Sequence, residues 1–90
     1  MTGTCEICNR VEELTFHHLI PTTLHTNKKF KKLYEKEYLK SHGINICKEC
    51  HSTIHRFWTE KELGNYYNTL NKILKNRKFK EFVIWVKKQK

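Results

Sequence analysis

Four cysteines in two pairs are the first residues of this sequence that could do chemistry. Cys5 and Cys8 form one C-x-x-C motif and Cys47 and Cys50 form another, so no cysteine is left over. Because no secretory signal is recognisable, we expect a reducing compartment, where such pairs favour metal binding over disulfides. Two such knuckles can surround Zn²⁺ tetrahedrally and leave no position open for a substrate. We therefore expect a structural zinc site, with two disulfides as the alternative.

The histidines are the second group with chemical potential, and all six lie between residues 17 and 55. His17 and His18 are adjacent, whereas His51 and His55 are four residues apart, which places them on one face of a helix. If both groups meet in one cleft, their imidazole nitrogens make a second metal site. The chain has no aspartate, so histidine must supply most of the chemistry. For His25 an ordinary structural role is the simpler interpretation.

Positive charge is in large excess, with 18 Lys and Arg against 9 Asp and Glu and a net charge of +9 at pH 7. Such an excess favours a nucleic acid or another anionic partner. Several basic side chains could contact successive phosphates of a nucleic acid. The alternative is that they form the solvated face of a helix. The main candidates are Lys28, Lys29, Lys48 and Arg56, and Lys31, Lys32, Lys36 and Lys40 could extend the same track.

The longest apolar run, Phe82 to Val86, is far shorter than the ~20 residues that a membrane-spanning helix needs. No repeat, low-complexity tract or linker interrupts the chain. We therefore expect a cytoplasmic protein with no membrane partner, folded as a single domain over residues 1–90.

The hydrophobic pattern predicts the elements that must position these groups. Residues 14–19 favour a strand, and Ile44 to Ile46 could pair with it as the second strand of a hairpin. Helical spacing predicts four helices, with a capping box of Thr59 and Glu62 at the start of the third and a buried strand as the alternative to the last. Their expected ranges are 28–40, 51–58, 59–76 and 79–86. The sequence thus predicts an α+β fold.

Taken in order, these motifs resemble the HNH endonuclease family. The matching elements are Cys5-Glu6-Ile7-Cys8, then His17-His18 followed by Ile20-Pro21, then Cys47-Lys48-Glu49-Cys50-His51. The resemblance covers residues 5–58 and implies a ββα-metal core stapled by the four-cysteine zinc site. Residues 59–90 would be a helical extension like the tail of small stand-alone members.

The resemblance implies a metal-dependent endonuclease that hydrolyses phosphodiester bonds in DNA, more readily double-stranded, as a monomer or a homodimer. His18 would be the general base that activates water, and His17 and His51 would ligate the catalytic metal. His55 would be a further ligand or a phosphate contact. A shell of imidazoles favours Zn²⁺, Ni²⁺, Co²⁺ or Mn²⁺ over Mg²⁺, which prefers oxygen ligands.

The sequence departs from the family pattern in two respects. All candidate ligands of the catalytic metal are histidine, with no aspartate at the position before the base, and the residue expected to orient the base is replaced. The asparagine that usually precedes the second C-x-x-C by five residues is His42 here, and Asn45 lies out of register, so either could orient His18. The alternative function is a non-catalytic zinc-knuckle module that binds nucleic acid, in which the histidines serve structure alone. A protein-interaction domain with a basic surface is a third class, and it would show little salt-dependent affinity for nucleic acid.

Overall fold

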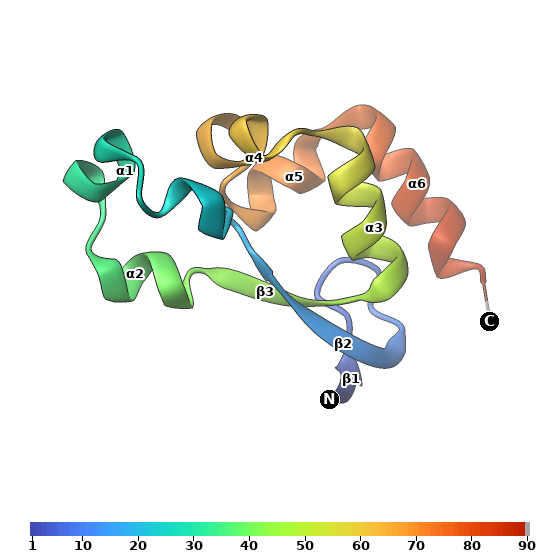
Figure 1. Ribbon diagram of the computed structural model, residues 1–90. Coiled ribbons are helices and arrows are strands. Elements are labelled where there is room, and N and C mark those ends of the chain that lie inside the picture. The colour runs from blue at the N-terminus through green and yellow to red at the C-terminus, as the bar shows by residue number, and fades with distance from the viewer. Residues whose placement is uncertain (90) are drawn as a thin grey trace.

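The computed structural model describes residues 1–89, which form a small antiparallel sheet and a group of short helices (Figure 1). The strands are β1 (Thr2–Thr4), β2 (Val11–His18) and β3 (Gly43–Cys47), in the order β1-β2-β3. A 3₁₀ turn, η1 (Thr22–Leu24), and six helices complete the fold. The helices are α1 (Lys28–Leu33), α2 (Lys36–Ser41), α3 (Lys48–Phe57), α4 (Glu60–Tyr66), α5 (Leu70–Lys75) and α6 (Arg77–Lys87). The α+β class is therefore confirmed.

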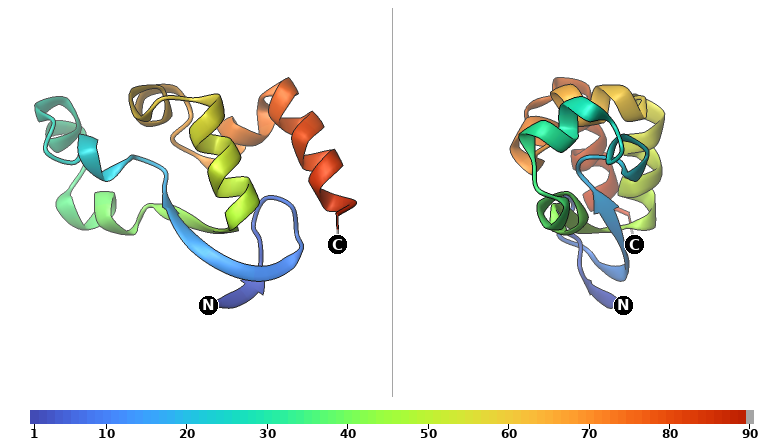
Figure 2. Two further views of the ribbon diagram at one scale, coloured as in Figure 1. Left: turned by 45° about the vertical axis from the view of Figure 1, so that its right-hand side comes forward. Right: turned by 60° about the vertical axis from the view of Figure 1, so that its left-hand side comes forward.

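The hairpin expected from the sequence is present, because β2 pairs antiparallel with β3 from Leu14 opposite Cys47 to His18 opposite Gly43. The chain leaves the hairpin between these strands, forms η1, α1 and α2 beyond its far end, and returns (Figures 1 and 2). Strand β1 was not anticipated. It is only three residues long and contains Gly3, so no alternation of side chains could reveal it.

Two helices expected to be continuous are each broken in two. The helix predicted over residues 28–40 stops at Tyr34, whose backbone is extended, and restarts after Glu35. The break turns Leu39 inward, where it joins Ile20 and Phe30 in a small separate core. Periodicity could not show this, because Phe30 and Leu39 share no face of one straight helix.

The helix predicted over residues 59–76 likewise ends at Tyr66 and restarts at Leu70. Its start is confirmed, since the Thr59 and Glu62 side chains each accept a hydrogen bond from the other residue's backbone N–H. Tyr67 interrupts it by stacking on Trp58, with ring centroids 4.1 Å apart. Thr69 then accepts a hydrogen bond from Lys72 N and begins a new helix.

The main core lies where helices α3–α6 pack together on one side of the sheet (Figure 2). Its largest fully buried apolar side chains come from β3, α3, α4, α5 and α6. They are Ile46, Ile54, Leu63, Ile73, Phe79 and Val86. The last segment is helical, as predicted, with Phe79, Val83 and Val86 on its buried face. Within residues 1–89 no helix combines the length and apolarity that crossing a membrane requires.

Gly43, the first residue of β3, is required by close packing beside His18. A Cβ atom at this position would lie well inside van der Waals contact of the Phe16 ring and the His17 carbonyl oxygen. The carbonyl belongs to the hairpin backbone and cannot move without disturbing the pairing of His18 with Gly43. This glycine therefore lets the two strands close next to the histidine pair.

We predict that Gly43→Ala lowers the free energy of unfolding by about 1–3 kcal/mol, because the added methyl group overpacks the end of the hairpin. Urea denaturation followed by circular dichroism measures the change. Gly3→Ala is the matched control, since its Cβ would meet only the mobile end of Leu14, at 3.1 Å. Equal stability of the two variants would contradict this account of Gly43.

Candidate functional site

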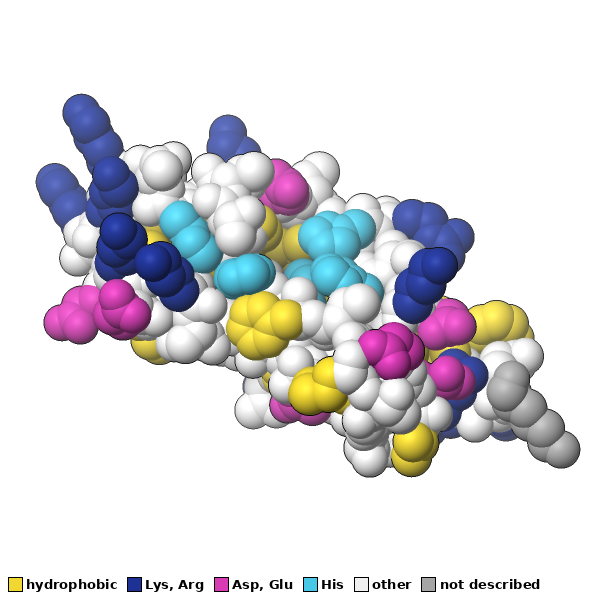
Figure 3. Space-filling view, turned by 60° about the horizontal axis from the view of Figure 1, so that its bottom comes forward, with side chains coloured by type: hydrophobic (Ala, Val, Ile, Leu, Met, Phe, Trp, Pro, Cys, Tyr) yellow, Lys and Arg dark blue, Asp and Glu magenta, His cyan; other side chains and the backbone are white. Residues whose placement is uncertain are grey.

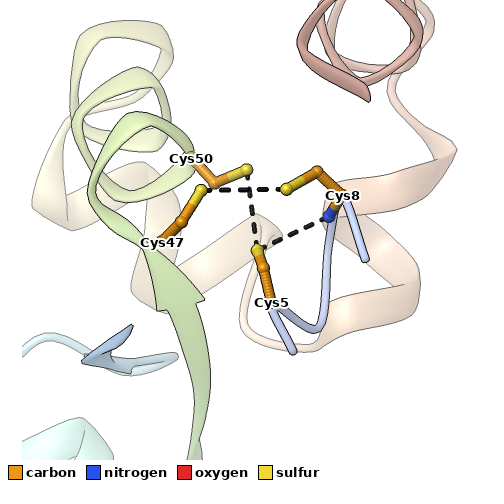
Figure 4. A group of neighbouring side chains, drawn as sticks. All are labelled: Cys5, Cys8, Cys47 and Cys50. Atoms are coloured by element: carbon orange, nitrogen blue, oxygen red, sulfur yellow. Dashed lines mark hydrogen bonds between the residues drawn. The ribbon is translucent and has the colours of Figure 1, made fainter. Parts of the chain in front are cut away.

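The four cysteines meet at one buried point between the N-terminal segment and the start of α3 (Figure 4). Cys5 and Cys8 come from the loop after β1, Cys47 ends β3, and Cys50 lies in the first turn of α3. The Sγ atoms of Cys5 and Cys50 are 3.8 Å apart, as are those of Cys8 and Cys47. The sulfurs point toward one another, so this cluster could hold a metal ion.

The first knuckle is shaped by a tight turn. Asn9 has a positive φ of 63°, which asparagine tolerates better than most residues. Its amide donates to the Cys5 carbonyl at 2.9 Å, and the Cys8 amide points at Cys5 Sγ at 3.5 Å. These contacts aim both sulfurs of the loop at the second pair.

The electrostatics of the cluster favour a bound cation. The hydrogen bond between the Cys5 and Cys50 sulfurs lowers the pKa of Cys5 and raises that of Cys50. Burial raises the pKa of Cys47 to about 12. Four buried sulfurs cannot all ionise beside one another unless a positive ion compensates them. A closed set of four thiolates is typical of structural Zn²⁺ sites.

Three histidines form a second group of potential ligands, separate from the cysteines. His17 comes from β2, whereas His51 and His55 lie one turn apart on α3. The His17 ring is 5.1 Å from the His51 ring and 5.5 Å from the His55 ring, measured between centroids. One nitrogen from each of the three lies within 4.8 Å of the others, so this group could also hold a metal ion.

His17 carries the clearest sign of an incomplete site. It is only 1% exposed, and its Nε2 atom has no hydrogen-bond partner in the described part of the chain. Burial, and then the neighbouring imidazoles of His51 and His55, lower the pKa of His17 to about 3. Burial lowers the pKa of His51 as well. The neutral rings keep lone pairs available, and a metal ion would satisfy the buried nitrogen.

Thr15 orients His51 and was not anticipated from the sequence. Its hydroxyl donates to the Ile46 carbonyl at 3.1 Å and lies 2.8 Å from His51 Nδ1. With the hydroxyl proton given to Ile46, Nδ1 of His51 donates to Thr15 and Nε2 is the free acceptor. Such second contacts fix the ring and the tautomer of a metal-binding histidine.

His18 shares a cavity of about 230 Å³ with the three histidines. Its ring lies 4.8 Å from that of Phe16, on the same side of β2, and 5.7 Å from that of His25. Partial burial, and then the His25 charge, lower the pKa of His18. Both His17 and His18 reach this cavity although they are neighbours on a strand, because β2 ends here and the chain bends toward Pro21.

Glu60 is a further residue of the histidine cavity that sequence reasoning missed. It lies at the start of α4, and its carboxylate accepts a hydrogen bond of 2.6 Å from the Thr23 hydroxyl. Capping boxes often place an acidic residue in the first turn of a helix, so nothing in the local pattern separated this glutamate from an ordinary helix start.

The structure does not bring the His42 side chain to His18. Its Nε2 donates to the Asn68 carbonyl at 2.7 Å, and its ring stacks on Tyr38 with centroids 4.7 Å apart. The His42 backbone carbonyl instead accepts a hydrogen bond of 3.1 Å from the amide of Leu19, next to His18. Asn45 lies opposite Phe16 in the hairpin, two residues from His18.

The four basic residues predicted to bind nucleic acid have different surroundings. Lys48 lines a shallow hollow together with His51 and His55. Lys29 donates to Asn65 Oδ1 at 2.6 Å, and Lys28 and Arg56 are exposed, as Lys29 is. Figure 3 shows histidine side chains gathered across the middle of one face, with lysine and arginine side chains near both ends of the group.

The sequence is similar to that of a known bacterial protein. A Bacillus subtilis (strain 168) protein described as "Uncharacterized protein YisB" is 30% identical over 90 residues, covering 99% of this chain and 78% of that protein. No family model matches the sequence, and no solved structure matches it. The similarity therefore spans the C-terminal helices as well as the part that carries the cysteines and histidines.

We predict that the purified protein retains one divalent ion that depends on the four cysteines. Cys8→Ser should lose this ion and much of the cooperative fold, because the closed thiolate set contributes to folding directly. Elemental analysis and thermal denaturation measure the two effects. His17→Ala is the control and should keep the ion. A Cys8→Ser protein that unfolds like the parent chain would contradict the prediction.

Thr15→Val should weaken metal binding by the histidines about 10- to 100-fold, because His51 loses the contact that fixes its tautomer. Calorimetric titration with Ni²⁺ measures this affinity. The control is Thr53→Val, which removes a hydroxyl that donates to the Glu49 carbonyl and forms no hydrogen bond with a histidine within residues 1–89. If both variants bind Ni²⁺ equally well, Thr15 does not orient the site.

Proposed function

We propose that this chain, which belongs to the same family as YisB of Bacillus subtilis, is a metal-dependent endonuclease that hydrolyses phosphodiester bonds in DNA. The observation that carries the proposal is the meeting of His17, His51 and His55 with His18 in one cavity. Three of these imidazoles form a ligand group, and the fourth stands beside it as a candidate base. Hydrolysis of a phosphodiester needs both parts.

His18 is the general base of the proposed reaction. Its lowered pKa keeps the imidazole neutral at working pH, so the ring can accept a proton from a water molecule that attacks phosphorus. The contact with Phe16 limits where the ring can turn, and the backbone bond from Leu19 to the His42 carbonyl holds the end of its strand. The orienting role that the family gives to an asparagine side chain thus passes to packing and backbone pairing.

His17, His51 and His55 are the proposed ligands of the catalytic metal. A divalent ion held there would neutralise charge on the scissile phosphate and stabilise the leaving 3′ oxygen. The all-imidazole set favours Zn²⁺, Ni²⁺, Co²⁺ or Mn²⁺ over Mg²⁺. The cysteine cluster would hold a structural Zn²⁺ that takes no part in the reaction.

The arrangement of the elements supports the HNH resemblance. Strands β2 and β3 are an antiparallel hairpin, and α3 follows directly and packs on both strands. This is the strand, strand, helix order of a ββα-metal core, with the first histidine pair on β2 and the second on α3. The net charge of +9 is consistent with a polyanionic substrate.

Plasmid cleavage tests the proposal, with protein first treated with EDTA and then given Mn²⁺, Ni²⁺, Zn²⁺ or Mg²⁺. We expect wild type to cut, least with Mg²⁺, and His18→Ala to cut at least ~100-fold more slowly, because it loses the base. Lys75→Ala, an exposed change on α5, is the control and should cut like wild type. Circular dichroism establishes that each protein remains folded.

Two results would overturn the proposal. One is cleavage by His18→Ala at the wild-type rate. The other is no cleavage by any protein while wild type and His18→Ala bind DNA equally and with salt sensitivity, which would identify a non-catalytic binding module. The second result would also show that the histidines have no catalytic role.

A further inference from the structure

A second and larger cavity lies beside the histidines, in the segment that the chain inserts between β2 and β3. It has a volume of about 440 Å³ and is bounded by the end of η1 and by α1 and α2. Its walls include His25, Lys31, Tyr34, Lys36, Leu39 and Lys40. The break between α1 and α2 at Tyr34 creates this hollow, because a continuous helix would run straight past it.

The charge of the cavity suits an anion. Lys31, Lys36 and Lys40 contribute three positive charges, against one negative charge from Glu35. None of these lysines forms an ion pair or a side-chain hydrogen bond with another residue in the range 1–89, so their ammonium groups are free to bind. Three ammonium groups around a hollow are typical phosphate contacts.

The walls also include an apolar part that is held rigidly. Tyr34 stacks between Phe30 and Tyr38, with centroid distances of 6.4 and 5.1 Å and interplanar angles of 17° and 13°. Tyr34 lines the cavity together with the buried side chain of Leu39. A base or a sugar could lie against such a wall while the lysines contact its phosphate.

His25 joins this cavity to the proposed active site. Its ring lines the lysine cavity and lies 5.7 Å from the ring of His18, which lines the histidine cavity. Its Nε2 donates to the Ile20 carbonyl at 2.7 Å, which holds the ring in place between the two hollows. A strand with its scissile phosphate beside His18 would therefore pass His25 before it reached the lysines.

We infer that the cavity between α1 and α2 binds a nucleotide of the substrate strand that flanks the cleaved bond, with Lys31, Lys36 and Lys40 at its phosphate. The inference rests on the proposed nuclease function and assigns it a subsite. Lys28 and Lys29, which the sequence favoured as contacts, line no part of this cavity. The inserted segment then has a role in substrate binding, while the histidines perform the hydrolysis.

Two substrates separate the subsite from the reaction. Bis(p-nitrophenyl) phosphate has a phosphodiester but no flanking nucleotide, whereas a short DNA oligonucleotide has both. The test variant is Lys31→Gln with Lys36→Gln and Lys40→Gln. The control is Lys75→Gln with Lys78→Gln and Lys88→Gln. These three lysines are exposed and lie outside this cavity, and their replacement removes the same charge.

We expect the cavity variant to raise KM for the oligonucleotide about tenfold and to reduce the salt dependence of binding by up to about one unit per lysine, with kcat changed less than about twofold. It should hydrolyse bis(p-nitrophenyl) phosphate like wild type. The control variant should change KM for the oligonucleotide by less than about twofold, because diffuse charge is screened.

The outcomes distinguish the two proposals. If wild type hydrolyses both substrates and the two triple variants have equal effects on the oligonucleotide, the subsite is wrong and the nuclease stands. If the cavity variant loses activity on bis(p-nitrophenyl) phosphate as well, the lysines act on the reaction and the subsite is again wrong. If wild type hydrolyses neither substrate, the nuclease proposal fails and the subsite fails with it.

Discussion

The buried contact of four cysteine sulfurs is the constraint on which the rest of this structure depends. It ties the loop after β1 to the junction of β3 and α3, which are separated by 38 residues of chain between Cys8 and Cys47. His51 follows Cys50 directly, so the same junction sets the direction of α3 against β2. A chain of this size buries only a modest core, and a bound ion would add the stability that the core lacks.

A second constraint is that burial keeps the clustered imidazoles in their neutral form. Burial of His17 among other histidines makes protonation costly, and Thr15 leaves one His51 nitrogen as an acceptor. Both effects leave imidazole lone pairs available to bind a metal cation. The cysteine cluster is subject to the same effect, because burial and mutual proximity disfavour four thiolates without a compensating charge. The two clusters differ in their access to solvent. The four cysteines are buried, whereas the three histidines line a cavity that also contains His18.

The inserted segment has its own small core, separate from the main one. Ile20, Phe30 and Leu39 pack apart from the main cluster. Helix α2 contacts β2, and η1 contacts α4, where the Leu24 side chain packs against Gly64. These contacts hold the lysine cavity beside the histidines.

The sequence by itself determined the two cysteine pairs, the hairpin, the helix after the second knuckle and the start of α4, because spacing and capping are local properties. It did not determine strand β1 or the breaks at Tyr34 and Tyr67. The first break turns Leu39 into the small core with Ile20, and the second accompanies the stacking of Tyr67 on Trp58. The candidate site divides in the same way. The site was predicted from four residues, His17, His18, His51 and His55. The contacts of Thr15 and Glu60 and the position of His42 depend instead on tertiary packing, because their hydrogen-bond partners are distant in sequence.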